Sequence, residues 1–221
     1  MIVKFLRILK KEGYSGIHKR LKSRLRKLKY ALLHQIGSES VTSTYGIVMR
    51  KNWKDATFRF CVEGTYGTFF SNHLRSKNKK FNFLDIGANQ GLYTLIAAQN
   101  LCCDKVLCVE PVKHTFLKLV ENIHLNKVSE KVMALNFGLG IKSESISIFL
   151  RENHSGAASQ ISHHPKENLN SETIEIVTAQ ILSDLSIINN KHPIVCKIDV
   201  EGKEIDVLKT LIGHQIIESD R

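Results

Sequence analysis

Glycines and acidic residues stand where predicted strands end, and together they could bind a ligand. In the stretch FLDIGANQGLYTL, residues 83–95, Asp85 ends an apolar run and is followed by Gly87 and Gly91. Glycines at such a turn let a ligand approach the backbone and the N-terminus of the next helix. A carboxylate beside the turn repels a pyrophosphate and favours a ligand with a positively charged or amine-bearing end.

A dinucleotide is the first alternative ligand for this turn. Its fingerprint is G-x-G-x-x-G, whereas the turn reads G-A-N-Q-G, with Asn89 where the second glycine would stand. Glu110 ends the next predicted strand, where a carboxylate can accept hydrogen bonds from both hydroxyls of a ribose. These residues favour S-adenosylmethionine, and an NAD-dependent oxidoreductase is the weaker alternative.

Asp199 and Glu201 end a further apolar run, PIVCKIDVEG, and are candidate catalytic residues. If S-adenosylmethionine is the ligand, the reaction would be methyl transfer from a sulfonium, an in-line displacement in which an alcohol acceptor needs positioning and a route for its proton. Either carboxylate could accept that proton or hold a divalent cation that acidifies the hydroxyl. Alternatively, Glu201 interacts only with the positive end of the following helix.

The elements that must position these residues alternate along the chain from residue 81. The runs FNFLDIG, KVLCVEP and KVMALNFG predict strands, and LYTLIAAQN and HTFLKLVENIHLN predict helices. Continuously apolar strands separated by helices predict a parallel, doubly wound sheet covered on both faces. PIVCKIDVEG adds a buried strand, and KEIDVLKTLIG adds a helix with Gly213 as its C-cap.

Between these parts, ESISIFL and ETIEIVTA predict an antiparallel pair joined by a long polar loop, and LSDLSI predicts a short helix. The loop is the best candidate for binding the acceptor, with His154 as a candidate base or acceptor contact. His163 and His164 are adjacent in the same loop, which is more typical of polar surface than of a metal site. We therefore predict no metal ligand.

Residues 1–40 predict a basic amphipathic helical arm. Residues 1–30 hold eleven Lys and Arg and one acid, whereas the rest of the chain holds 21 basic and 20 acidic residues. One face of the helix is apolar, and its members are Ile17, Leu21, Leu25, Leu28 and Leu32. Such a helix can dock on its own domain or lie on an anionic membrane surface. Nucleic acid is disfavoured because no aromatic residues interleave the basic ones.

Residues 41–80 predict a hairpin, formed by YGIVMR and TFRFCV, and a helix that leads into the core. The five cysteines show no C-x-x-C spacing, which favours reduced thiols in a cytoplasmic protein. Peripheral contact at the inner membrane surface is the expected additional location. The apolar runs are all shorter than the roughly 20 residues that span a bilayer.

Three segments closely resemble the signature segments of FkbM-type methyltransferases: FLDIGANQGLYTL, VEPVKHTFLKLVENIHLN and KIDVEGKEIDVL. The resemblance covers residues 60–213 and implies a class I, Rossmann-like methyltransferase domain over residues 81–221. The implied cofactor is S-adenosyl-L-methionine, and the implied acceptor is a hydroxyl of a sugar, a glycan or another small metabolite. The resemblance assigns the cofactor to Asp85, Gly87, Asn89, Gly91, Glu110 and Asn136, and an active-site role to Asp199 and Glu201.

The C-terminus departs from this family pattern. A complete class I sheet has about three further strands after KIDVEG, whereas eight residues follow Gly213. We therefore expect a sheet that is short of its C-terminal strands, with an exposed apolar edge that favours homo-oligomers. A degenerate cofactor-binding or scaffold protein without catalysis is the alternative function.

Overall fold

The computed structural model describes residues 37–157, 169–184 and 192–217, and single helical positions between residues 21 and 32. The chain divides into two compact units, Met1–Val41 and Thr42–Arg221, and the first strand, β1 (Ser40–Thr42), spans their boundary. In the first unit, the described leucines are helical and exposed; they are Leu21, Leu25, Leu28 and Leu32. Ile17 of the predicted apolar face lies outside the described residues.

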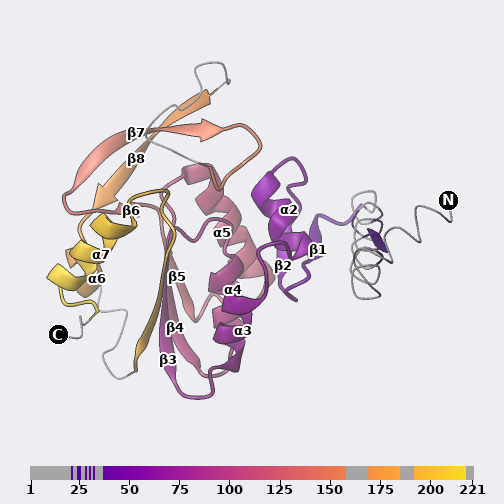
Figure 1. Ribbon diagram of the computed structural model, residues 1–221, viewed down its shortest axis with the longest axis horizontal. Coiled ribbons are helices and arrows are strands. Elements are labelled where there is room, and N and C mark those ends of the chain that lie inside the picture. The colour runs from indigo at the N-terminus through magenta and orange to yellow at the C-terminus, as the bar shows by residue number, and fades with distance from the viewer. Residues whose placement is uncertain are drawn as a thin grey trace, which may run out of the picture. The chain divides into compact units, whose positions relative to one another are not determined.

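A four-stranded parallel sheet forms the centre of the second unit (Figure 1). In sheet order its strands are β5 (Val132–Leu135), β4 (Cys103–Val109), β3 (Phe81–Ile86) and β9 (Ile194–Ile198). Every residue of β3 is buried, as the continuously apolar sequence predicts for a central strand. The register pairs Asp85 with Cys108 of β4 and with Lys197 of β9, so the carboxyl ends of these strands meet at one edge.

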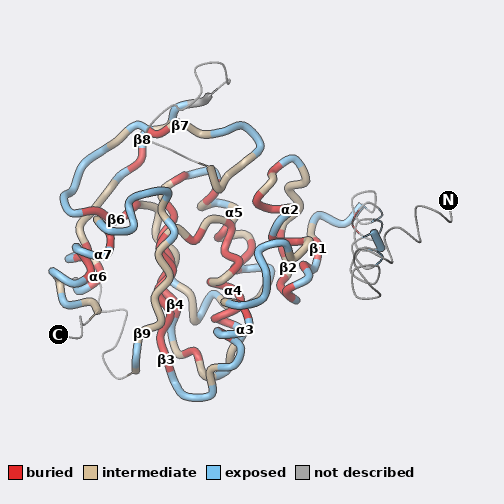
Figure 2. The backbone as a smooth tube through the Cα atoms, viewed as in Figure 1, coloured by how far each residue is buried: buried red, intermediate tan, exposed pale blue. Residues whose placement is uncertain are grey.

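Helices cover both faces of this sheet, which confirms the doubly wound α/β fold (Figure 1). One face carries α3 (Phe69–Ser76), α4 (Leu92–Gln99) and α5 (Lys113–Leu125). The other carries α6 (Gln180–Asp184), which is the predicted short helix, and α7 (Glu204–Gly213). Buried residues follow the strands and the inner sides of the helices (Figure 2). A core cluster joins the second face of the sheet to α6 and α7 through residues such as Leu84, Leu107, Leu182, Val207 and Leu211.

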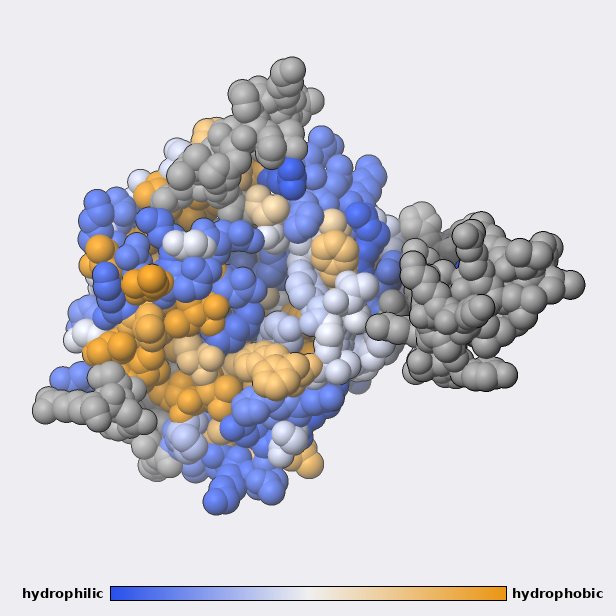
Figure 3. Space-filling model, viewed as in Figure 1, coloured by the Kyte–Doolittle hydropathy of each residue, from blue (hydrophilic) through white to orange (hydrophobic). Residues whose placement is uncertain are grey.

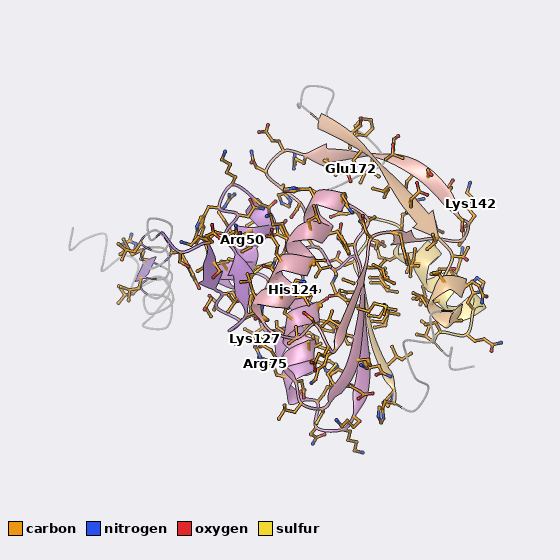
Figure 4. The ribbon with its side chains drawn as sticks, turned by 180° about the vertical axis from the view of Figure 1, so that it is seen from behind. Arg50, Arg75, His124, Lys127, Lys142 and Glu172 are labelled. Carbon is orange, nitrogen blue, oxygen red and sulfur yellow. The ribbon has the colours of Figure 1, made fainter. Side chains whose placement is uncertain are left out.

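A second sheet arches over the carboxyl ends of the central strands (Figure 1). Its strand order is β6-β8-β7, formed by β6 (Gly138–Leu139), β8 (Leu169–Val177) and β7 (Glu144–Arg151). The β7 and β8 strands are antiparallel, as their alternating sequence predicts. Glu172 of β8 accepts a hydrogen bond from the backbone N–H of Lys113 at 2.9 Å, which ties this sheet to the start of α5 (Figure 4).

The predicted hairpin in residues 41–80 is wrong in its second strand. YGIVMR contains the short strand β2 (Val48–Arg50), but TFRFCV lies in the helix α2 (Ala56–Glu63). Asp55 caps this helix by accepting the backbone N–H of Phe58, and Gly64 ends it in a left-handed conformation. The buried residues of α2 recur with helical spacing, as Thr57, Phe58, Cys61 and Val62.

The predicted C-cap at Gly213 is also wrong. Gly213 is the last helical residue of α7, and His214 is the C-cap, with its N–H bonded to the carbonyl of Thr210 at 3.1 Å. The left-handed residue that follows the helix is Gln215, at φ 56°. The turn out of this helix is therefore made two residues later than the glycine signal predicts.

The β9 strand lies at the edge of the central sheet. It pairs with β3 on one side, and no strand within the described ranges pairs with the other side. Apolar side chains gather on the surface over α7 and β9 (Figure 3), and Ile205, Leu208 and Ile212 of α7 are exposed. All five cysteines are free thiols. None of the helices in the described part of the chain has the length and apolar character needed to cross a membrane.

Candidate active site

A cavity of about 600 Å³ lies at the carboxyl ends of β3, β4 and β9, where the β7–β8 sheet forms part of its lining. Its volume falls in the range of about 300–1,000 Å³ that small-molecule sites occupy. Predicted site residues from all three strand ends line it, namely Gly87, Asn89, Glu110, Asp199 and Glu201. The structure therefore brings these three strand ends together around one cavity.

The turn after β3, residues 87–91, is here called the cofactor turn. Gly87 has φ +75°, and a Cβ atom there would lie 2.0 Å from the carbonyl oxygen of Asp199, so only glycine fits. Gly91 has φ +91°, and a Cβ atom there would lie 2.6 Å from Cδ1 of Leu119. Gly91 therefore supplies the left-handed backbone conformation at the N-cap of α4, and it does not line the cavity.

Glu110 joins the end of β4 to the cofactor turn. Its carboxylate accepts the backbone N–H of Asn89 at 2.9 Å on Oε2 and that of Val112 at 3.0 Å on Oε1. Burial raises the pKa of Glu110 from an ordinary value of 4.5 to about 7, although both N–H donors act in the opposite direction. A carboxylate has about four lone-pair positions, so Glu110 can still accept hydrogen bonds from a ligand in the cavity.

The structure places Asp85 behind the cofactor turn and not in the lining of the cavity. Asp85 is fully buried, forms an ion pair with Nζ of Lys197 at 3.2 Å, and accepts the hydroxyl of Thr94 at 2.6 Å. Its charge is therefore compensated from within the protein, and the expectation that it attracts a cationic ligand end needs correction. The physical reason is the sheet register, which sets Asp85 directly beside Lys197.

Lys197 links this buried pair to the cavity. Its Nζ donates to the carbonyl of Gly87 at 2.9 Å and lies 3.6 Å from the carboxylate of Asp199. Burial alone would lower the pKa of Lys197, but the charges of Asp85 and Asp199 raise it above its ordinary value. Lys197 therefore stays protonated and holds the carboxyl ends of β3 and β9 together.

Asp199 and Glu201, here called the acidic pair, both line the cavity. Burial raises the pKa of Glu201, as do the nearby charges of Asp199 and Glu204, whereas His154 lowers it. The carboxylate that accepts backbone N–H groups before α7 is that of Glu204, from Gly202 at 3.1 Å and from Val200 at 3.4 Å. Glu204 therefore holds the turn before α7, whereas the N-cap residue Lys203 makes no capping hydrogen bond through its side chain.

Two other predicted residues lie beside the cavity and outside its lining. Asn136 donates hydrogen bonds to the carbonyls of Glu110 at 2.9 Å and Pro111 at 3.0 Å, so it supports the end of β4. The next residue, Phe137, lines the cavity instead. His154 lines a smaller cavity of about 160 Å³ instead. Residues 158–168 of the predicted acceptor loop, with His163 and His164, lie outside the described residues.

Sequence reasoning missed Asp55, Gln90 and Ser155, which meet beside the cofactor turn. Asp55 and Gln90 are buried, and the amide of Gln90 donates to Asp55 at 2.9 Å. The sequence contains a signal for Asp55, because an aspartate directly before a helical stretch is a typical N-cap. The interpretation of this stretch as a hairpin does not use that signal. Nothing local indicates the contact with Ser155, which lies a hundred residues further along the chain.

One comparison with known protein families assigns a family to this chain. A sequence model of the Methyltransferase FkbM domain matches residues 85–220. Methyltransferase 1 of Beauveria bassiana (strain ARSEF 2860) is 31% identical over 143 residues, which cover 58% of this chain and 57% of that protein. The chain therefore spans less than two thirds of this curated relative.

Solved structures are more distant. The methyltransferase FkbM from Methylobacillus flagellatus KT is 20% identical, with a TM-score of 0.44, over 67% of this chain and 34% of that one. A SAM-dependent methyltransferase from Agrobacterium tumefaciens is 16% identical, with a TM-score of 0.34, over 46% and 33%. The assignment rests on the domain match, which covers more than half of the chain and confirms the resemblance of its three motifs. The protein belongs to the FkbM family of methyltransferases, and its expected cofactor is S-adenosyl-L-methionine.

Proposed function

We propose that this chain binds S-adenosylmethionine in the larger cavity and methylates a hydroxyl group of a sugar or another small metabolite. The observation that carries the proposal is that Glu110 and the acidic pair line one cavity from different strands. Because β3 lies between β4 and β9, the two sets of carboxylates are separated by two strand spacings, or about 10 Å. That separation leaves room for a nucleoside at one end and an acceptor at the other.

The residues around Glu110 fit the nucleoside part of the cofactor. Glu110 would accept the two ribose hydroxyls, since its carboxylate faces the cavity with acceptor capacity to spare. An apolar wall beside it would contact the adenine, and it is formed by Phe137, Ile146, Ile148, Ile174 and Ile176. The exposed backbone of the cofactor turn would lie along the rest of the ligand. The cofactor, when bound, supplies an activated methyl group on a sulfonium.

The acidic pair would serve the acceptor. Glu201 is suited to act as the base, because burial and neighbouring carboxylates raise its pKa. Asp199 lies 3.6 Å from the ammonium of Lys197, so it is held in place to accept a hydrogen bond from the acceptor hydroxyl. In this proposal Glu201 takes the hydroxyl proton and Asp199 orients the oxygen.

A transfer assay tests this function. The purified chain is incubated with methyl-labelled S-adenosylmethionine and a panel of hydroxylated sugars and small metabolites, with and without EDTA. We expect label on oxygen, and we expect Glu201→Gln to lose transfer while it keeps binding S-adenosylhomocysteine. Loss of transfer in EDTA would assign the acidic pair to a divalent cation instead. Cofactor binding without transfer to any acceptor would favour the non-catalytic binding protein.

A further inference from the structure

Two segments far apart in the sequence meet beside the cofactor turn. The first is the start of α2 with the residues before it, 52–57. The second is residues 153–156, directly after β7, here called the docking segment. The backbone N–H of Ala56 donates to the carbonyl of Asn153 at 2.7 Å, and that of Gly156 donates to the hydroxyl of Thr57 at 2.9 Å. These bonds lay the docking segment along the start of α2.

The carboxylate of Asp55 is the centre of this contact. Its Oδ2 accepts the backbone N–H of Ser155 at 2.7 Å. Its Oδ1 accepts the N–H of Phe58 at 2.7 Å and the amide of Gln90 at 2.9 Å, and lies 3.2 Å from Oγ of Ser155. Asp55 is itself only 6% exposed. Loss of this acceptor would leave several buried donors without a partner, which is far more costly than loss of one surface hydrogen bond.

The same network reaches the residues that line the cavity. Oγ of Ser155 lies 3.1 Å from Oδ1 of Asn89, and the backbone N–H of Asn89 donates to Glu110. Asn89, Ser155, Gly156 and Thr57 all line the larger cavity. A continuous chain of hydrogen bonds therefore runs from the start of α2 through the docking segment to Glu110, the proposed ribose ligand.

We propose that Asp55 is a positioning residue for the cofactor site: it fixes the docking segment against the cofactor turn and so sets the position of Asn89. This inference rests on the proposed location of the cofactor beside Glu110. It adds a role for the segment before the family domain, because residue 55 lies outside the matched range of 85–220.

The chain contains a natural reporter for this coupling. Trp53 is its single tryptophan, and it packs edge-on against Phe58 with ring centroids 5.3 Å apart. Phe58 also donates its N–H to Asp55. Occupation of the cavity that shifts Asn89 and Ser155 should therefore change the emission of Trp53.

The test compares Asp55→Asn with the unmodified chain, by calorimetry and by Trp53 fluorescence during titration with S-adenosylhomocysteine. Asparagine has the same shape as aspartate, but an NH2 group replaces one carboxylate oxygen. In either orientation this NH2 group faces a hydrogen-bond donor, which is the N–H of Ser155 or the N–H of Phe58. We expect a folded variant whose affinity for S-adenosylhomocysteine is at least about tenfold lower. Its remaining binding should no longer change the emission of Trp53. The matched control is Glu130→Gln, the same carboxylate-to-amide change at an exposed residue outside the lining of the cavity, which should leave both readouts unchanged.

A second variant, Ser155→Ala, covers the case in which Asp55→Asn does not fold. It removes the hydroxyl near Asn89 and keeps the backbone bond to Asp55, so it should fold, bind more weakly and show a reduced Trp53 signal. Unchanged affinity and signal in either folded variant would overturn the positioning role. A silent Trp53 in the binding-competent unmodified chain would overturn the coupling. If the unmodified chain does not bind at all, the proposed cofactor site itself fails.

Discussion

The variant Glu110→Gln removes one negative charge at the end of β4 and keeps the size of the side chain. In the native site both carboxylate oxygens accept a backbone N–H, from Asn89 and from Val112. A glutamine can accept only one of them, because an NH2 group replaces one oxygen, and that NH2 group cannot accept a ribose hydroxyl. The change therefore affects the cofactor turn and the proposed ribose contact together.

The expected loss of affinity follows from the type of hydrogen bond that the variant removes. A hydrogen bond to a charged group contributes about 1.5–3 kcal/mol, which corresponds to about a 10- to 150-fold change in Kd. We expect Glu110→Gln to weaken binding of S-adenosylhomocysteine by that range. The half-exposed Glu121 on α5, which pairs with Lys118 at 3.0 Å and lies outside the lining of the cavity, supplies the control variant Glu121→Gln.

The pH dependence gives an independent check. Burial raises the pKa of Glu110 to about 7, and the carboxylate form is the one that accepts both ribose hydroxyls. Binding should therefore weaken as pH falls below about 7, up to about tenfold per pH unit. For the unliganded fold the sign is opposite: the stability from this raised pKa is present below 4.5 and is lost as pH rises through about 7.

The assay is calorimetric titration with S-adenosylhomocysteine at about pH 6 and about pH 8, for the unmodified chain and both variants. We expect pH-dependent binding in the unmodified chain and in Glu121→Gln, and weak, nearly pH-independent binding in Glu110→Gln. Equal affinity of Glu110→Gln and the unmodified chain would remove Glu110 from the ribose role.

Three further predictions concern the buried ion pair, the N-terminal arm and the sheet edge. Lys197→Met leaves Asp85 buried without its counter-ion and should lower the free energy of unfolding, measured by urea denaturation, by about 3–5 kcal/mol. A loss smaller than that of the exposed control Lys203→Met would contradict a structural role for the Asp85–Lys197 pair. Deletion of residues 1–30 should abolish binding to anionic vesicles and spare cofactor binding, and equal vesicle binding after deletion would exclude a membrane role for the arm. The exposed apolar surface on α7 should promote self-association, so that replacing Ile205 and Leu208 by lysine lowers the sedimentation coefficient. A chain that already sediments as a monomer would refute this last expectation.

The sequence predicts the central sheet well because its strands are long, apolar runs separated by helical patterns. The strand ends then follow from topology, so Glu110, Asp199 and Glu201 could be placed at one cavity without coordinates. The stretch TFRFCV was misassigned because its apolar residues fit both a strand and one side of a short helix. The capping interaction of Asp55 decides between the two, and it is a local signal that a hairpin interpretation overlooks.

Contacts between distant segments could not be predicted from local patterns. The pairing of Asp85 with Lys197 depends on the register of β3 against β9, and that register is set by the packing of the whole sheet. The bond from Ser155 to Asp55 likewise joins residues a hundred positions apart. An acidic residue at the end of a strand therefore indicates a ligand site. Whether its carboxylate faces the ligand or supports the turn depends on the side chain or backbone group that it bonds within the protein.

The measurement that tests the central claim most directly is calorimetric titration of the purified chain with S-adenosylhomocysteine, with NAD as the control ligand. If the cavity between Glu110 and the acidic pair is the cofactor site, the chain binds the first ligand saturably at one site and does not bind NAD. A folded chain that binds neither, or that prefers NAD, would contradict the account.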